Sequence, residues 1–71
     1  MKLKNYTLTI NRFGTAHRTI DRYDNMSFNM AKTIWNDNLN LYEGLGHVKD
    51  MTMRCEGNVL FKTTFRLERE D

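Results

Sequence analysis

The chain has 71 residues, a formal net charge of +2 at pH 7, no proline and one cysteine. This length fits a single small domain, 1–71, with a modest core. A single cysteine excludes an internal disulfide framework. No apolar run approaches the ~20 residues that span a bilayer, and no apolar signal-like segment opens the sequence. We therefore expect a protein of a reducing, cytoplasmic compartment, with no membrane contact.

The first predicted strand covers residues 4–13. Tyr6, Leu8 and Ile10 alternate with polar residues, which is the period-two pattern of a strand with one apolar face. Gly14 and Thr15 then interrupt the pattern, and glycine at the first position of a two-residue loop favours a type II′ hairpin turn.

The returning strand, residues 16–23, is more polar and is typical of a sheet edge. Two registers are open. A two-residue turn pairs Leu8 with Asp21 and places Arg18 and Arg22 on the outer face of the sheet. A three-residue loop pairs Ile10 with Ile20 and turns the arginines toward the helix side, because a one-residue slip inverts every side chain.

Residues 27–42 predict the only helix. Ser27 can cap it by accepting a hydrogen bond from the first turn, and Gly44 and Gly46 can end it in the left-handed conformation. At about 100° per residue, two apolar stripes result. The first holds Phe28, Ala31, Trp35, Leu39 and Tyr42, and the second holds Met30, Ile34 and Leu41.

Two further strands follow the helix. Residues 48–55 place Met51, Met53 and Cys55 on one face. A turn at Glu56-Gly57-Asn58 then leads into residues 59–67, the most regular alternation in the chain. We expect the terminal residues 1–3 and 68–71 to be frayed.

These elements predict an α+β domain of order ββαββ, with a four-stranded, mainly antiparallel sheet and the helix packed on one face. The first and last strands alternate most regularly, so we place them in the middle, which gives the order 2-1-4-3. The other face should be uncovered and should carry Thr7, Thr9, Asn11, Thr52, Arg54, Leu60, Lys62, Thr64 and Arg66.

The chain lacks a recognisable catalytic or metal-binding motif. Cys55, His17 and His47 are the only thiol and imidazoles. A nucleophilic cysteine needs a base and an orienting group, whereas Cys55 is expected to point into the core as a small apolar residue. Two separate histidines do not make a zinc site. We expect no cofactor and no enzymatic activity.

Binding to a larger protein is the leading hypothesis. Basic Arg12, Arg18 and Arg22, with Tyr23, lie on the first hairpin and can steer an acidic partner. The second helix stripe, Met30, Ile34 and Leu41, supplies apolar contact area if the sheet leaves it exposed. A free edge strand or this stripe can also form a homodimer.

The alternative hypothesis is weak nucleic-acid binding through Arg54, Lys62 and Arg66 on the open face, with help from the hairpin arginines. Single-strand binders stack bases on exposed aromatic rings. Here Tyr6, Phe61 and Phe65 fall on the apolar parity and should be buried, which favours the protein-binding hypothesis.

In size, composition and expected architecture the chain is similar to many phage-encoded inhibitors of host enzymes or defence systems. This resemblance implies a small accessory factor that binds and inhibits or redirects a host protein. It involves no motif residues, so it assigns no functional residues.

Overall fold

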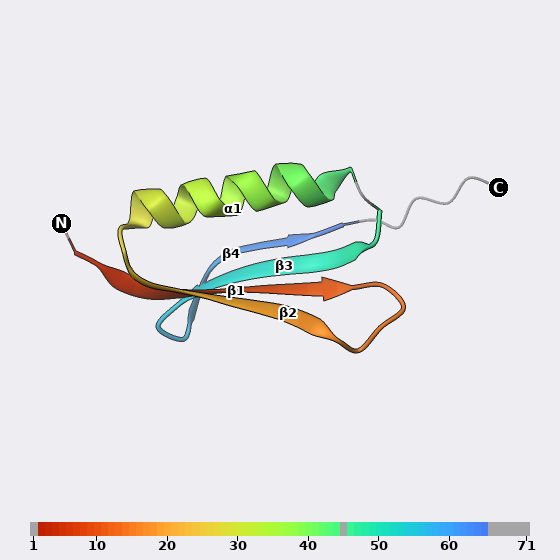
Figure 1. Ribbon diagram of the computed structural model, residues 1–71, viewed down its shortest axis with the longest axis horizontal. Helices are drawn as coiled ribbons and strands as arrows, with labels where there is room; N and C mark the ends of the chain where they lie inside the picture. Colours follow the sequence, from red (N-terminus) through yellow and green to blue (C-terminus); the bar gives the residue numbers. More distant parts are fainter. Residues whose placement is uncertain (1, 45, 66–71) are drawn as a thin grey trace.

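The computed structural model describes residues 2–44 and 46–65. They form one small α+β unit in the predicted ββαββ order (Figure 1). Its elements are β1 (Lys4–Arg12), β2 (Arg18–Met26), α1 (Phe28–Glu43), β3 (Val48–Cys55) and β4 (Asn58–Thr64). The second strand starts and ends later than predicted, and the last strand ends earlier. The frayed end predicted for 68–71 lies outside the described residues.

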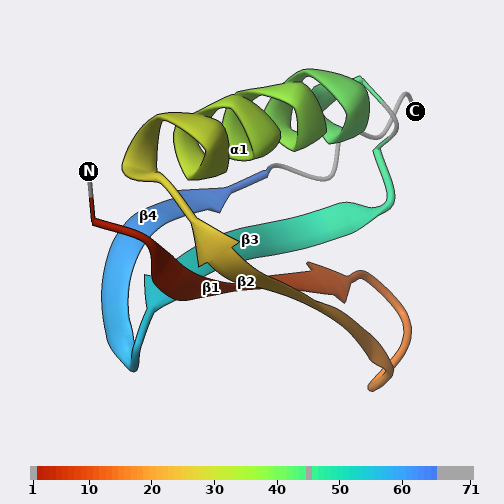
Figure 2. The same ribbon diagram turned by 60° about the vertical axis from the view of Figure 1, so that its left-hand side comes forward.

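All four strands belong to one antiparallel sheet in the order β2-β1-β3-β4. The helix lies across one face of this sheet, and the other face is open (Figure 2). The open-sheet architecture is confirmed, but the predicted order 2-1-4-3 is wrong, because β3 and not β4 pairs with β1.

Burial distinguishes β3, an inner strand, from β4, an edge strand. Met51 and Met53 have 0% of their surface exposed, and Thr52 on the opposite face is also buried. β4 alternates more regularly, but Val59 is exposed and Phe61 only half-buried. The connection from the end of α1 to Val48 is also short, so β3 lies directly beneath the helix. This position is at the centre of the sheet.

The first hairpin adopts the register in which Leu8 is opposite Asp21. The connection is longer than the predicted two-residue turn and covers residues 13–17. Gly14 has φ +76°, as a left-handed turn position requires. The N–H of Phe13 donates to the carbonyl of His47 at 2.9 Å. The chain after β1 therefore stays beside the start of β3 and separates from β2.

The helix begins as predicted. The Ser27 hydroxyl accepts a hydrogen bond from the Met30 N–H at 3.2 Å, which satisfies one of the free donors of the first turn. At the other end Gly44 caps the helix with φ −93° and not in the left-handed region. Gly46 takes the positive φ, +75°, and turns the chain back toward the sheet.

A bulge changes the start of β4. Glu56 and Gly57 both have positive φ, +48° and +91°, as a type I′ turn requires. This turn pairs Cys55 with Asn58, and the register then shifts by one residue before Phe61 meets Met53. As a result Leu60 lies beside Phe28 on the helix side, and its predicted place on the open face is wrong.

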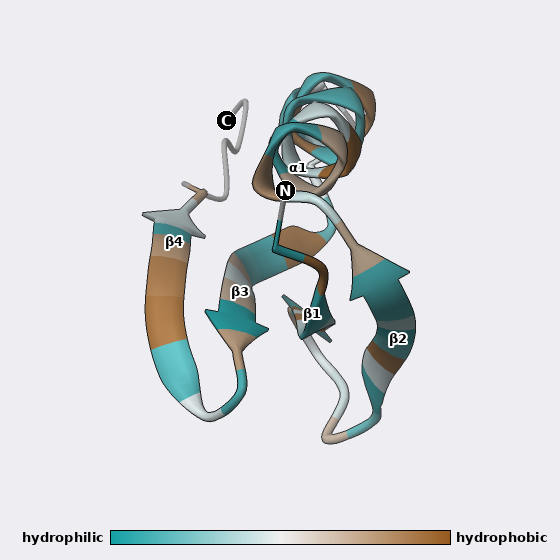
Figure 3. Cartoon of the chain, turned by 90° about the vertical axis from the view of Figure 1, so that its left-hand side faces the viewer, coloured by the Kyte–Doolittle hydropathy of each residue, from teal (hydrophilic) through white to brown (hydrophobic). Residues whose placement is uncertain are grey.

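The core lies between α1 and the three strands β1, β2 and β3, with β4 at the side of this layer (Figure 3). Trp35 is buried as predicted and stacks on Phe61, with ring centroids 5.5 Å apart. Phe28, on the same predicted stripe, is 48% exposed, because it sits in the first helical turn beside the β4 side of the sheet. The buried apolar residues are Tyr6, Leu8, Ile10, Ala31, Trp35, Val48, Met51, Met53 and Cys55.

Trp35 should carry much of the stability of the domain. We expect Trp35→Ala to lower the free energy of unfolding by about 3–5 kcal/mol, since it removes a buried ring and leaves a cavity against Phe61. Urea denaturation measures this value. Leu41→Ala is the control, because Leu41 is exposed on the same helix and its loss should cost about 0.5 kcal/mol or less. A Trp35→Ala protein within about 1 kcal/mol of the parent would contradict the assigned helix–sheet contact.

Candidate binding surfaces

The uncovered face of the sheet is built by all four strands. Side chains alternate along a strand, and Leu8 and Ile10 point toward α1 because both are buried in the core. The odd-numbered residues of central β1 and their cross-strand neighbours therefore point away from the helix. This open face holds Thr7, Thr9, Asn11, Arg18, Ile20, Arg22, Asp50, Thr52, Arg54, Val59, Lys62 and Thr64.

Four cationic side chains lie on this face. Arg22 and Arg54 lie on either side of Thr7 in one cross-strand row, so about 10 Å separates their backbones. Arg18 lies four residues from Arg22 on β2, about 13 Å along the strand. Lys62 completes the set from β4. These cations are therefore spread over a broad surface and do not form one tight cluster.

Short polar side chains fill the centre of the open face. Thr9 and Thr52 are opposite each other and only 8% and 7% exposed, although no described element lies over them. Longer neighbours on the same face must therefore cover them, and Ile20 and Lys62 stand at the two ends of their row. At the Asn11 end, the Asn11 amide donates to the Asp50 carboxylate at 2.6 Å, which fixes the main acidic group of the face.

The predicted arginine cluster is only partly assembled. Arg18 and Arg22 share the open face, but the Arg12 guanidinium donates to the hydroxyl of Thr19 at 2.6 Å. Thr19 is opposite buried Ile10 and therefore points to the helix side. A register shift after Asn11 accompanies this change. Arg12 is thus separated from Arg18 and Arg22 by the sheet.

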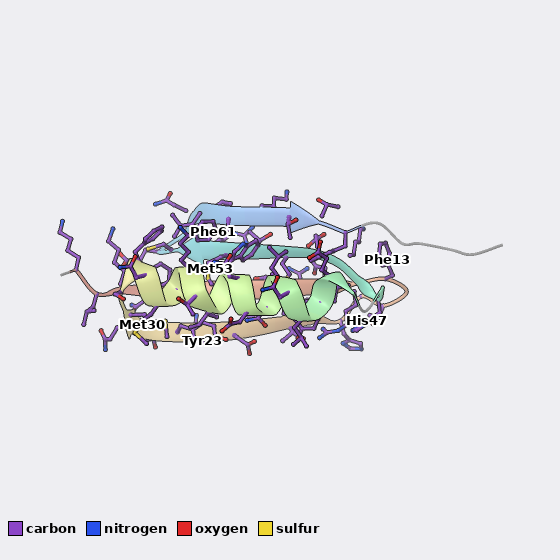
Figure 4. The ribbon with its side chains drawn as sticks, turned by 90° about the horizontal axis from the view of Figure 1, so that it is seen from above. Phe13, Tyr23, Met30, His47, Met53 and Phe61 are labelled. Carbon is purple, nitrogen blue, oxygen red and sulfur yellow. The ribbon has the colours of Figure 1, made fainter. Side chains whose placement is uncertain are left out.

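Tyr23 also lies on the helix side. It is opposite Tyr6, half-buried and packed against the core. Figure 4 shows Tyr23 and Met30 along the same side of α1, with Phe61 on the other side. Burial raises the pKa of Tyr23 above its ordinary value, and the nearby Asp21 and Tyr42 add to this effect. Tyr23 therefore belongs with the helix stripe and not with the arginines.

The second helix stripe is exposed at both ends. Met30 and Leu41 are 57% and 58% exposed, whereas Ile34 between them is half-buried against the core. A shallow hollow of about 250 Å³ lies beside Met30 and Ile34, with Asn29 and Thr33 as its polar lining. The structure thus offers two separate surfaces: a cationic sheet face and a small apolar helix stripe.

A groove of about 380 Å³ lies where α1 begins, between the start of β1 and β4. Its lining residues are Lys2, Lys4, Tyr6, Ser27, Phe28, Asn29, Cys55 and Leu60. Cys55 is 8% exposed there. Neither histidine is in this lining, and His47 packs edge-on against Tyr42 with ring centroids 6.3 Å apart. The groove therefore provides a thiol without an imidazole base.

Burial also shapes the chemistry of Tyr6 in this groove. Tyr6 is 2% exposed, and burial, the Cys55 thiol and Glu56 together raise the pKa of its hydroxyl above the ordinary value. A hydroxyl with a raised pKa holds its proton more firmly. Within the described residues no group of three or more His, Cys, Asp or Glu side chains is placed to hold a metal ion.

The residues predicted for nucleic-acid binding share the open face with the hairpin arginines. Arg54 and Lys62 join Arg18 and Arg22 there, whereas Arg66 lies outside the described residues. The register with Leu8 opposite Asp21 places all four cations on one face, and it is one of the two registers that the sequence leaves open.

Comparison with known proteins gives no relative: no protein-family model, curated protein or solved structure matches this chain. In the part of the chain that the structure describes, no helix is long and apolar enough to cross a membrane.

Stability should fall at alkaline pH. The raised pKa of Tyr6 means that, as pH rises above about 10, the unfolded chain loses the tyrosine proton while the folded protein still keeps it. The unfolded state then binds fewer protons, so the free energy of unfolding decreases with pH in that window. Tyr6→Phe cannot ionise and should make this decrease shallower, as measured by urea unfolding from pH 7 to 11.

Tyr23→Phe should act in the same direction, because the pKa of Tyr23 is raised as well. The double variant is then expected to show the flattest profile. An alkaline slope that is identical in the parent and the double variant would contradict the assigned burial of both hydroxyls.

Cys55 should be replaceable. It is a small buried side chain in the core, so Cys55→Ala is expected to cost about 1 kcal/mol of stability and to leave partner binding unchanged. Thermal unfolding and a binding assay measure the two effects. Loss of binding in a well-folded Cys55→Ala protein would instead indicate chemistry at the thiol.

Proposed function

We propose that this protein is a non-catalytic binding protein whose open sheet face meets an acidic surface of a larger protein. One observation carries the proposal: Arg18, Arg22, Arg54 and Lys62 come from three strands and share the one sheet face that no described element covers. Exposed ion pairs contribute only about 0–1 kcal/mol to stability, so such a set has little value for the fold itself.

The arrangement of this face suits the recognition of an extended acidic surface. Cations about 10 Å apart raise the rate of encounter with an oppositely charged partner. Ile20 and Lys62 flank the two buried central threonines, so a partner meets the longer side chains of this face and not the threonines. Ile20, which lies on the same face as these cations and is 55% exposed, supplies apolar contact area.

We further propose that the partner is a host protein and that the chain is a phage-type accessory factor, which inhibits an enzyme or a defence system of its host or redirects it. The size of the chain and its resemblance to small phage-encoded inhibitors support this role. The host cell cytoplasm would then be the place of action.

Nucleic-acid binding is the second candidate function, and it is favoured by the same four cations. None of the strand residues assigned to the open face is aromatic, so these strands provide no platform for stacking bases on aromatic rings. Binding would then depend on phosphate contacts and fall steeply with salt.

The test compares two double charge reversals with the same net charge. Arg22→Glu with Arg54→Glu alters the open face, whereas Lys2→Glu with Lys32→Glu alters exposed residues elsewhere. A partner captured from host lysate is identified by mass spectrometry, and its association rate is measured with each variant at two salt concentrations. We expect the open-face variant to associate about tenfold more slowly or worse at low salt, since steering depends on charge sign.

The control variant should associate at nearly the parental rate, and circular dichroism should show that both variants are folded. Equal association rates for the two variants would show that the open face takes no part in the interaction. Fluorescence anisotropy with labelled single- and double-stranded oligonucleotides completes the test. Affinity that falls steeply with salt and is lost in the open-face variant would support the nucleic-acid function instead.

A further inference from the structure

Within the described residues β2 and β4 are the strands with an unpaired edge, and these two edges differ in charge. β2 carries four charged residues, Arg18, Asp21, Arg22 and Asp24, and charge is a common protection of an edge strand against pairing with another chain. β4 carries Lys62 alone and has no proline or acidic residue. The sequence thus protects one edge and leaves the other open to pairing.

The backbone of β4 shows which groups face this edge. The N–H of Phe65 donates to the carbonyl of Lys49 on the β3 side at 2.9 Å, and Thr63 and Met51 continue the same register. In an antiparallel ladder, alternate residues direct their N–H and C=O groups toward one neighbour and away from it. The backbone groups of Lys62 and Thr64 therefore point to the free edge.

We infer that β4 pairs with β4 of a second copy of this chain, antiparallel and about a two-fold axis, with Thr63 opposite its own counterpart. In this register Lys62 is opposite Thr64 of the second copy. Both residues have backbone groups directed at the free edge, so each of the two symmetric pairs forms a closed ring of two hydrogen bonds.

Charge complementarity selects this register. Thr64 is opposite Asp50 on β3, so the two-fold places Lys62 of one copy and Asp50 of the other in one row of the open face. Two strand spacings, about 10 Å, separate their backbones, and the four-carbon stem of lysine shortens that gap. Two neighbouring registers also use the free groups. One would set Lys62 against Lys62, and directly opposed like charges are destabilising. The other would set Thr64 against Thr64 and forms one ring of hydrogen bonds within the described residues instead of two.

The dimer would be a continuous eight-stranded sheet. An axis perpendicular to the sheet keeps both helices on one side and both cationic faces on the other, because opposite residues of paired strands point the same way. This inference concerns the edge of β4 and does not require Arg22 or Arg54. Its failure can therefore be told apart from failure of the proposed function.

The first experiment measures the oligomeric state of the purified protein by sedimentation equilibrium over a concentration series. We expect reversible dimerisation in the parent. Thr64→Pro removes an N–H that points to the free edge and spares the β3–β4 ladder, a position where proline is tolerated. Loss of two symmetric hydrogen bonds should raise the dimer dissociation constant about tenfold or more. Thr64→Val keeps the N–H and should remain dimeric.

A second set of variants tests the register without proline. Lys62→Glu places like charges in the shared row and should weaken the dimer. Asp50→Lys added to Lys62→Glu should restore it, because the two charges are then exchanged and attract each other again. A parent that stays monomeric to roughly millimolar concentration overturns the inference, since a dimer weaker than this gains only about 4 kcal/mol. A folded Thr64→Pro protein that dimerises like the parent, or a Lys62→Glu dimer that the second change does not restore, overturns it too.

Discussion

The pairing of β1 with β3 beneath α1 is the interaction on which the rest of the molecule depends. Each of the two hairpins can form locally, but neither has an apolar surface large enough to cover the helix. Where β1 meets β3, Leu8 is opposite Met53 and Ile10 is opposite Met51, and all four side chains are at most 1% exposed. This contact creates the platform on which Trp35 packs, and it also gives the sheet its continuous outer face.

That dependence explains why the surface chemistry follows from the core. Because Leu8 and Ile10 must face the helix, Thr7 and Thr9 must face outward, and the register of β2 and β3 then decides which charged residues join them. Arg22, Thr7 and Arg54 share a row only because both neighbours of β1 are held in this alignment. The charge pattern of the open face is therefore as well determined as the packing of the core, although no described residue covers it.

Much of the fold can be predicted from the sequence, because alternation and capping are local. The strand with Tyr6, Leu8 and Ile10 and the helix that follows Ser27 are both recognisable from their spacing. The order of β3 and β4 is not, since both alternate and the choice depends on which strand the helix covers. The bulge at Leu60 is also hidden, because Val59 and Leu60 are both apolar and either could face inward. For the same reason the sequence leaves open whether Arg18 and Arg22 share a face with Arg54 and Lys62, because the register of β2 is a tertiary property.

β1, the first strand of the chain, is one of the two inner strands of the sheet, and this has a consequence for the order of folding. Tyr6 is opposite Cys55, so most of the sequence separates the two halves of the central pairing. Contacts of such long range are formed slowly, because the chain loses entropy in closing the loop before the contact rewards it. During synthesis, a chain that ends after α1 would hold a hairpin and a helix whose apolar sides have no β3 between them. The apolar side chains of such an incomplete chain would stay exposed until β3 is synthesised or another protein covers them. This exposure, and with it the tendency to aggregate, would be greatest just before Met51 and Met53 are added.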